Sequence, residues 1–126
     1  MRQAYVDTSC LLAVALGERG ATALARRLAR FDALVSSNLL EAELRAALTR
    51  EGIDAATDLL TWVDWVFPER ALTAEIGRTL AAGYLRGADL WHVACALYVS
   101  QDPADLPFIT LDTRQRDVAR QLGFPR

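Results

Sequence analysis

Short apolar runs separated by longer helical stretches are the feature that most limits the fold of this chain. Residues 4–6, 33–35 and 108–111 form such runs, and each suits a short buried strand. Between them, residues 10–16, 21–30, 39–50, 54–66, 73–85, 88–100 and 113–122 have patterns typical of helices. Strands that alternate with helices predict an α/β fold with a small, mainly parallel sheet flanked by helices.

Size and composition favour a single domain over residues 1–126. A chain of 126 residues with 52% hydrophobic content can bury a substantial core without disulfides or structural metals. Cys10 and Cys95 lie far apart in apolar runs, which indicates buried free thiols and a reducing, cytoplasmic setting. We expect no membrane segment, because no run approaches roughly 18 apolar residues. We also expect no signal peptide, because the N-terminus leads directly into a strand.

Lysine is absent, and all 14 basic residues are arginine. This excludes a Walker A phosphate loop and any pyridoxal enzyme that forms a Schiff base with lysine. It also argues against receiver domains and haloacid-dehalogenase-type phosphatases, in which a lysine accompanies the aspartates. The formal net charge of −2 argues against a protein that coats duplex DNA through bulk positive charge. A nuclease whose acidic site binds cations is compatible with it.

Two aspartates follow predicted strands directly. Asp7 comes after strand 4–6, and Asp112 comes after strand 108–111. Ligands of such sheets bind beyond the carboxyl ends of the strands, so the two carboxylates are expected to converge at a site. Each aspartate also precedes a predicted helix, and a simple helix N-cap is the alternative interpretation of both.

Glu43 lies at the edge of the apolar face of the predicted helix 39–50. On a helical wheel it falls inside the apolar margin, whereas Glu41 falls on the other side, four residues before Arg45. Glu41 therefore suits an exposed ion pair. Burial of an unpaired carboxylate costs on the order of several kcal/mol, so Glu43 needs a cation or a hydrogen-bond donor. The alternative is an edge residue whose carboxylate reaches into water.

Asp89 and His92 lie one turn apart at the start of the predicted helix 88–100. An aspartate in the first turn can serve a site, or it can simply favour the helix dipole. His92 can orient Asp89 or hydrogen-bond to the backbone, and a structural role is the alternative to a catalytic one.

Four carboxylates on separate elements suit the binding of hard divalent cations. Neither a nucleophile motif nor a histidine paired as a general base accompanies them in the sequence. Mg²⁺ and Mn²⁺ prefer oxygen ligands, and two such ions can activate water for phosphodiester cleavage. Without metal, the clustered carboxylates would repel one another and some would protonate.

Four runs of the sequence, in order and at matching spacing, resemble PIN-domain proteins, with VapC toxins of bacterial toxin–antitoxin pairs as the most similar type. The runs cover residues 5–9, 36–44, 85–94 and 108–112. The resemblance implies a three-layer α/β/α fold and an Mg²⁺-dependent endoribonuclease. It implies an acidic quartet of Asp7, Glu43, Asp89 and Asp112, metal-supporting polar residues Ser9 and Thr110, and a common family residue at His92.

The resemblance also implies a homodimer and a cognate antitoxin that blocks the site. Gln115 stands where a fifth acid would be expected, three residues after Asp112. Arg86 and Arg114 are candidate contacts for RNA phosphates. Residues 54–86 carry no motif and are expected to set dimer contacts and RNA choice. Trp62 and Trp65 in this stretch are expected in the core, although tryptophan is also enriched at interfaces.

Two other functions are open at this point. A PIN-like scaffold could bind RNA or a protein without cutting it, although clustered negative charge has no purpose in such a module. A metal-dependent DNA nuclease is the other alternative, although the chain is too short for the helical segments with which flap-type enzymes clamp DNA.

Overall fold

The protein has a central parallel sheet of four strands in the order β3-β2-β1-β4, in a computed structural model that describes residues 1–54 and 56–126. The strands are β1 (Gln3–Val6), β2 (Ala33–Ser37), β3 (Val63–Val66) and β4 (Phe108–Ile109). Strands that are consecutive in the sheet are separated in sequence by helices, as the alternating pattern predicts. The α/β class and the parallel sheet are therefore confirmed.

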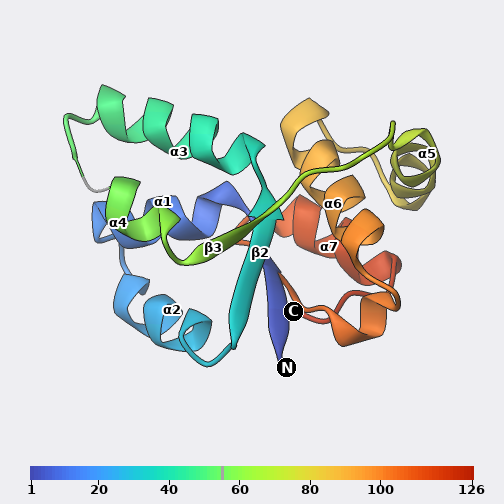
Figure 1. Ribbon diagram of the computed structural model, residues 1–126, viewed down its shortest axis with the longest axis horizontal. Helices are drawn as coiled ribbons and strands as arrows, with labels where there is room; N and C mark the ends of the chain where they lie inside the picture. The colour runs from blue at the N-terminus through green and yellow to red at the C-terminus, as the bar shows by residue number, and fades with distance from the viewer. Residues whose placement is uncertain (55) are drawn as a thin grey trace.

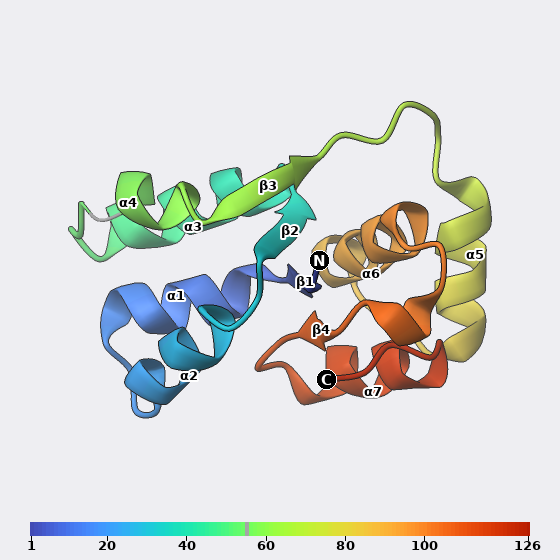
Figure 2. The same ribbon diagram turned by 60° about the horizontal axis from the view of Figure 1, so that its bottom comes forward.

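Helices cover both faces of the sheet and make three layers (Figures 1 and 2). On one side lie α1 (Thr8–Leu16), α2 (Ala21–Leu28), α3 (Leu39–Arg50) and α4 (Ala56–Leu60). On the other lie α5 (Thr73–Ala82), α6 (Gly87–Val99) and α7 (Thr113–Gln121), with a short 3₁₀ helix at Pro103–Asp105 before β4. None of the described helices is long and apolar enough to cross a membrane.

The central strand β1 contributes to both apolar cores. Tyr5 packs into the core on the α6 side, whereas Ala4 and Val6 pack into the core on the α1 and α3 side. Successive side chains of a strand point to opposite faces, and all three are completely buried because helices cover both faces. Cys10 and Cys95 are buried free thiols, one in each core, as predicted.

The predicted helix over 54–66 is wrong in its second half. The helix α4 ends at Leu60, and Val63–Val66 instead forms the edge strand β3 beside β2. The burial alternates only partly along β3, with Val63 and Val66 buried and Asp64 exposed, so four residues gave too short a period-2 signal to outweigh the leucines before them. Ala55, which the helix prediction included, lies outside the described residues.

The two tryptophans near β3 differ in burial. Trp65 packs against the core on the α1 side, as predicted, whereas Trp62 is 41% exposed and is not a core residue.

Two further element boundaries differ from the prediction. The helix predicted over 73–85 ends at Ala82, and the strand predicted over 108–111 comprises only Phe108 and Ile109. The second change matters for function, because it frees Thr110 to turn towards Asp7.

Candidate active site

The register of the sheet brings Asp7 and Thr110 together. In the parallel pair β1–β4, Val6 lies opposite Ile109, so the next residue of each strand leaves the sheet at the same edge. The Asp7 backbone N–H donates to the Ile109 carbonyl over 3.3 Å, which holds the two exits side by side. This is the carboxyl edge, where α/β sheets bind ligands.

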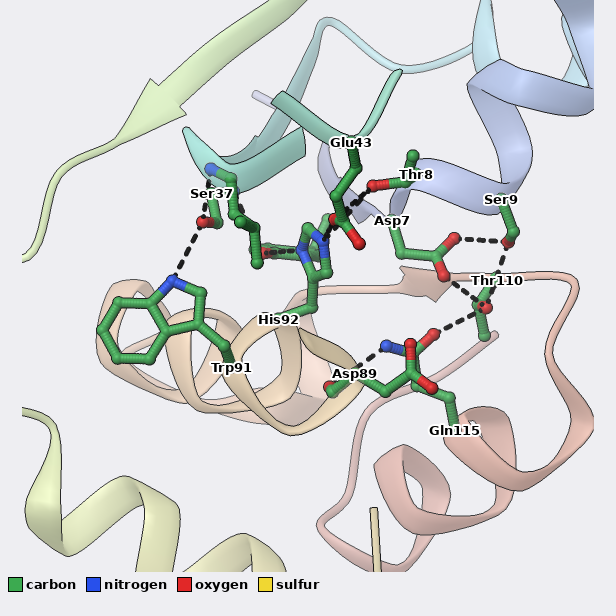
Figure 3. A network of polar contacts seen from close by, with 12 residues as sticks. Asp7, Thr8, Ser9, Ser37, Glu43, Asp89, Trp91, His92, Thr110 and Gln115 are labelled. Carbon is green, nitrogen blue, oxygen red and sulfur yellow. Dashed lines mark hydrogen bonds and ion pairs between the residues drawn. The ribbon is translucent and has the colours of Figure 1, made fainter. Parts of the chain in front are cut away.

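Asp7 is 4% exposed, and its carboxylate does not cap α1. Both of its oxygens accept hydrogen bonds from hydroxyls. Ser9 Oγ donates to Oδ1 over 2.6 Å, and Thr110 Oγ1 donates to Oδ2 over 3.0 Å (Figure 3). Of the two interpretations of Asp7, the structure therefore supports the inward-facing carboxylate. It also places the hydroxyls of Ser9 and Thr110 against Asp7.

Burial raises the pKa of Asp7 above its ordinary value. The hydrogen bonds from Ser9 and Thr110 and the nearby His92 act in the opposite direction, and the charge of Asp89 adds to the increase. No arginine or histidine of the described residues forms an ion pair with Asp7. The carboxylate is thus desolvated without a cation to compensate, which makes its charged form unfavourable.

Glu43 reaches the same region from α3. Its Oε1 accepts from Thr8 Oγ1 at 2.7 Å and lies 2.9 Å from His92 Nε2. Burial alone would raise the pKa of Glu43, but the hydrogen bonds from His92 and Thr8 outweigh it and hold the pKa below its ordinary value. The Glu43 side chain is 31% exposed, but its Oε1 is directed to Thr8 and His92. Glu41 is instead exposed and pairs with Arg45 at 2.8 Å, as predicted.

His92 holds Glu43, which corrects the prediction that it orients Asp89 or hydrogen-bonds to the backbone. It is 1% exposed, and its Nδ1 lies 2.8 Å from the Tyr5 hydroxyl. That hydroxyl accepts from the Ser37 backbone N–H at 3.0 Å, which leaves its own proton for Nδ1. His92 Nε2–H can then donate to Glu43, so one chain of hydrogen bonds links β2 to the site (Figure 3).

Asp89 and Asp112 complete the acidic group in different ways. Burial raises the pKa of Asp89, and the charges of Asp112 and Glu43 raise it further, so the carboxylates are close enough to affect one another. Asp89 has no hydrogen-bond partner for its carboxylate within the described residues. Asp112 is exposed and caps α7, with Oδ1 accepting from the Gln115 backbone N–H at 2.8 Å. The capping interpretation is therefore correct for Asp112, whereas Asp7 does not cap α1.

Gln115 is a site residue, although in the sequence it stands out only as the position of an absent fifth acid. It is completely buried, and its Nε2 donates to the Asp89 carbonyl over 3.2 Å. Its Oε1 lies 2.8 Å from the Thr110 hydroxyl, whose single proton serves either this oxygen or Asp7. A signal was present in the sequence, because Gln115 shares one helical face with the buried Val118 and Ala119.

The donor set fits a hard divalent cation, although the described side chains are not gathered around one point. No three His, Cys, Asp or Glu side chains within 1–54 and 56–126 are close enough together to hold an ion as they stand. The carboxylates of Asp7, Glu43 and Asp89 nevertheless converge from three elements (Figure 3). Glu43 Oε2, Asp112 Oδ2 and both carboxylate oxygens of Asp89 accept no hydrogen bond from the described residues. Carboxylate oxygens of this kind are what Mg²⁺ and Mn²⁺ prefer.

Of the two arginines predicted to contact phosphate, Arg86 lies near the site and Arg114 lines a separate depression. Arg86 is exposed and immediately precedes α6, and its charge lowers the pKa of Asp89. Arg114 lines a depression of about 470 Å³ between the loop after α5 and α7. Tyr84, which is 66% exposed, and Asp117 line the same depression.

Comparison with known proteins assigns the family. The PIN domain matches residues 4–121, which is nearly the whole chain. The chain therefore belongs to the PIN-domain family, as its four motifs indicate. Its fold is of the nuclease type, and members of the family are generally nucleases that depend on divalent metal ions. No curated protein and no solved structure gives a significant match to the chain.

Proposed function

We propose that the protein is a metal-dependent endoribonuclease of the toxin type that its motifs resemble. Mg²⁺ or Mn²⁺ would be bound by the carboxylates of Asp7, Glu43, Asp89 and Asp112. Its substrate would be single-stranded RNA, whose phosphodiester bonds are hydrolysed at the carboxyl edge of the sheet.

The observation that carries this proposal is the buried carboxylate of Asp7. It neither caps α1 nor pairs with a cationic side chain of the described residues, and burial raises its pKa. Two further carboxylates, those of Glu43 and Asp89, face the same region (Figure 3). A binding scaffold gains nothing from such an arrangement, whereas a cation site requires it.

The chain's own residues divide the tasks of the site. Ser9 and Thr110 fix the orientation of Asp7 by binding both of its oxygens. Thr8 and His92 bind Oε1 of Glu43 and leave its other oxygen free. A bound divalent ion would supply positive charge, which lowers the pKa of water and stabilises charge on phosphate oxygens.

Charge is compatible with an RNA substrate. When the four proposed ligands are set aside, 12 of the 16 acidic residues remain against 14 arginines, which leaves a formal charge of +2. All phosphate contacts from basic side chains must come from arginine, whose planar guanidinium can bind phosphate through two donors. Exposed Tyr84 beside Arg114 supplies an aromatic surface on which an unpaired base can stack.

The first test is the substitution Asp7→Asn, with Asp58→Asn on the exposed face of α4 as the matched control. End-labelled single-stranded RNA is incubated with each protein and either Mg²⁺, Mn²⁺ or EDTA. We expect wild type and Asp58→Asn to cut RNA only with metal, and Asp7→Asn to lose at least about 100-fold in rate. Thermal unfolding of each protein verifies that the fold is intact.

The alternative functions predict different results for cleavage and for metal binding. An Asp7→Asn protein that still cuts RNA with Mg²⁺ would contradict the proposal. A wild-type protein that shows no saturable Mn²⁺ binding would favour the non-catalytic scaffold. Equal or faster cleavage of single-stranded DNA of the same sequence would favour the DNA nuclease.

We further propose that the protein forms a homodimer and is blocked by a cognate antitoxin, as the resemblance implies. The exposed Trp62 and Phe67, at the two ends of the edge strand β3, support a protein interface in this region. Light scattering after size exclusion tests the dimer, for which Phe67→Ser is expected to increase the monomer fraction. A small upstream reading frame with a DNA-binding N-terminus and an arginine-containing tail would identify the antitoxin.

A further inference from the structure

Three arginines line a pocket on the far side of Thr110 from Asp7. The pocket has a volume of about 340 Å³ and is lined by Arg27, Phe108, Ile109, Thr110, Arg116 and Arg126. Arg27 comes from α2, Arg116 from α7, and Arg126 from the segment whose Pro125 carbonyl accepts from the Phe108 N–H at 2.7 Å. These three elements lie around β4 in Figure 2.

No side-chain carboxylate of the described residues neutralises the positive charge of the arginines in this pocket. No acidic side chain lines it, and in the described residues none of the three arginines has an ion-pair partner, the terminal carboxylate included. Other arginines do have such partners, since Arg45 pairs with Glu41 and Arg70 with Glu75. Three guanidinium groups that line one cavity make it a favourable place for an anion.

A structural role accounts for only one of the three arginines. Arg116 Nη2 donates to the Thr110 carbonyl at 2.9 Å and so fixes the backbone of the residue that holds Asp7. Arg27 and Arg126 donate no hydrogen bond within the described parts of the chain. Arg27 is only partly exposed and lines the pocket without a hydrogen-bond acceptor among the described residues.

The position of the pocket indicates the kind of anion. The Thr110 hydroxyl contacts Asp7 at 3.0 Å, while the Thr110 carbonyl contacts Arg116 at 2.9 Å, so one residue separates the pocket from the proposed metal ligands. A nucleic-acid strand cut at the carboxylates carries further phosphates on either side of the cut, and the pocket lies on the Thr110 side of the carboxylates. Guanidinium groups bind phosphate oxygens through paired, charge-assisted hydrogen bonds.

We propose that Arg27, Arg116 and Arg126 form a binding site for a backbone phosphate of the RNA strand, on the Thr110 side of the phosphate that is cut. This inference rests on the proposed nuclease function. It adds the path of the bound RNA strand, which would pass from the carboxylates across Thr110 towards α2. The site differs from the predicted contacts Arg86 and Arg114, which lie elsewhere along α6 and α7.

The test compares two double variants of equal charge. Arg27→Gln with Arg126→Gln removes the two arginines that have no structural hydrogen bond, and Arg116 is left in place because it supports Thr110. Arg50→Gln with Arg78→Gln, on the exposed surfaces of α3 and α5, is the matched control. Binding of a fluorescein-labelled single-stranded RNA is measured by anisotropy in EDTA, over a series of salt concentrations.

At low salt we expect the pocket variant to bind the RNA at least about five-fold more weakly than the control variant. The slope of log K against log salt should fall by about 0.7, which corresponds to one lost phosphate contact on a single strand. Phenylglyoxal labelling gives a second readout, in which RNA protects Arg27 and Arg126 of the wild-type protein but leaves Arg78 reactive.

Equal affinities and equal salt slopes for the two double variants would overturn the proposal. So would loss of binding to a labelled oligoglutamate peptide with RNA binding unchanged, since the pocket would then serve an acidic protein segment. Cleavage is measured separately with Mn²⁺. If the wild-type protein binds RNA through the pocket but does not cut it, only the nuclease function is refuted. If the wild-type protein cuts RNA but the pocket variant binds RNA as well as the control variant does, only this inference is refuted.

Discussion

Asp7 and Asp112 occupy similar places, each between a strand region and the first turn of a helix, but their carboxylates point to different partners. The exposed carboxylate of Asp112 accepts a hydrogen bond from a backbone N–H of its own helix. The buried carboxylate of Asp7 accepts hydrogen bonds from the hydroxyls of Ser9 and Thr110. The difference arises from the sheet, because Asp7 follows a central strand covered on both faces whereas Asp112 follows the edge strand.

Because Asp7 is buried as a carboxylate, we expect Asp7→Asn to stabilise the metal-free protein. The neutral amide can still hydrogen-bond to Ser9 and Thr110 but avoids the desolvation of a charge. Removal of such a functional carboxylate is expected to raise the free energy of unfolding at pH 7 by about 1 kcal/mol. Urea denaturation of both proteins in EDTA measures the difference.

The pH dependence of this effect has a definite sign. The folded-state pKa of Asp7 is raised above the ordinary value of 3.8, so the wild-type protein loses stability as pH rises from that value through the folded-state pKa. The advantage of Asp7→Asn should therefore grow between pH 4 and pH 7. If the advantage of Asp7→Asn stays constant or shrinks as pH rises, other groups compensate for the desolvation of Asp7, and the prediction is wrong.

At the scale of elements, the contact between α5 and α7 depends on Gly83. A Cβ atom at this position would lie 2.8 Å from Cγ2 of Val118, closer than real side chains approach. We expect Gly83→Ala to lower the free energy of unfolding by about 1–3 kcal/mol, through overpacking against α7. Calorimetry or urea denaturation measures this change.

The same helix supplies the control for that prediction. A Cβ atom at Gly77 in α5 would meet nothing within 4 Å, so Gly77→Ala should stabilise the protein by about 0.5–1 kcal/mol through helix propensity. Adding Val118→Ala to Gly83→Ala should recover part of the loss, since the clashing methyl groups are then absent. Additive effects of these two changes would exclude a steric origin.

The sequence predicts strands and helices well where the residues are continuously apolar or clearly periodic, and poorly where tertiary contacts decide. The buried strands β1 and β2 and the apolar helix α6 have clear signals. β3 has only four residues and follows the two leucines at the end of α4, and its pairing with β2 outweighs the local preference for helix. The sites of Asp7 and Glu43 follow from topology and helical periodicity, but the partners of His92 and Gln115 depend on distances between elements that no local pattern contains.

At the scale of the whole molecule, the proposed metal would connect four separate parts of the chain. Asp7 follows β1, Glu43 lies in α3, Asp89 in α6, and Asp112 precedes α7. An ion that binds only the folded protein stabilises it by about 2.7 kcal/mol at a concentration of 100 times Kd. We therefore expect Mn²⁺ to raise the thermal midpoint of the wild-type protein progressively with concentration.

Asp7→Asn serves as the control, because it is expected to start from a higher midpoint in EDTA and to respond little to Mn²⁺. A Mn²⁺-dependent rise of the thermal midpoint in the wild-type protein alone indicates a specific metal site, because general screening by salt acts on both proteins alike. A midpoint that rises equally in both proteins would contradict metal binding at Asp7.

The edge strand β4 and helix α7 come last in the chain, yet β4 pairs with β1, the first strand. Until residues 108–121 have left the ribosome, Asp7 has no Thr110 beside it and Asp89 has no Gln115 beneath it. Pairing over such a sequence separation closes late in folding. The groups around Asp7 and Asp89 would therefore be complete only after the last strand and helix have packed against the rest of the protein.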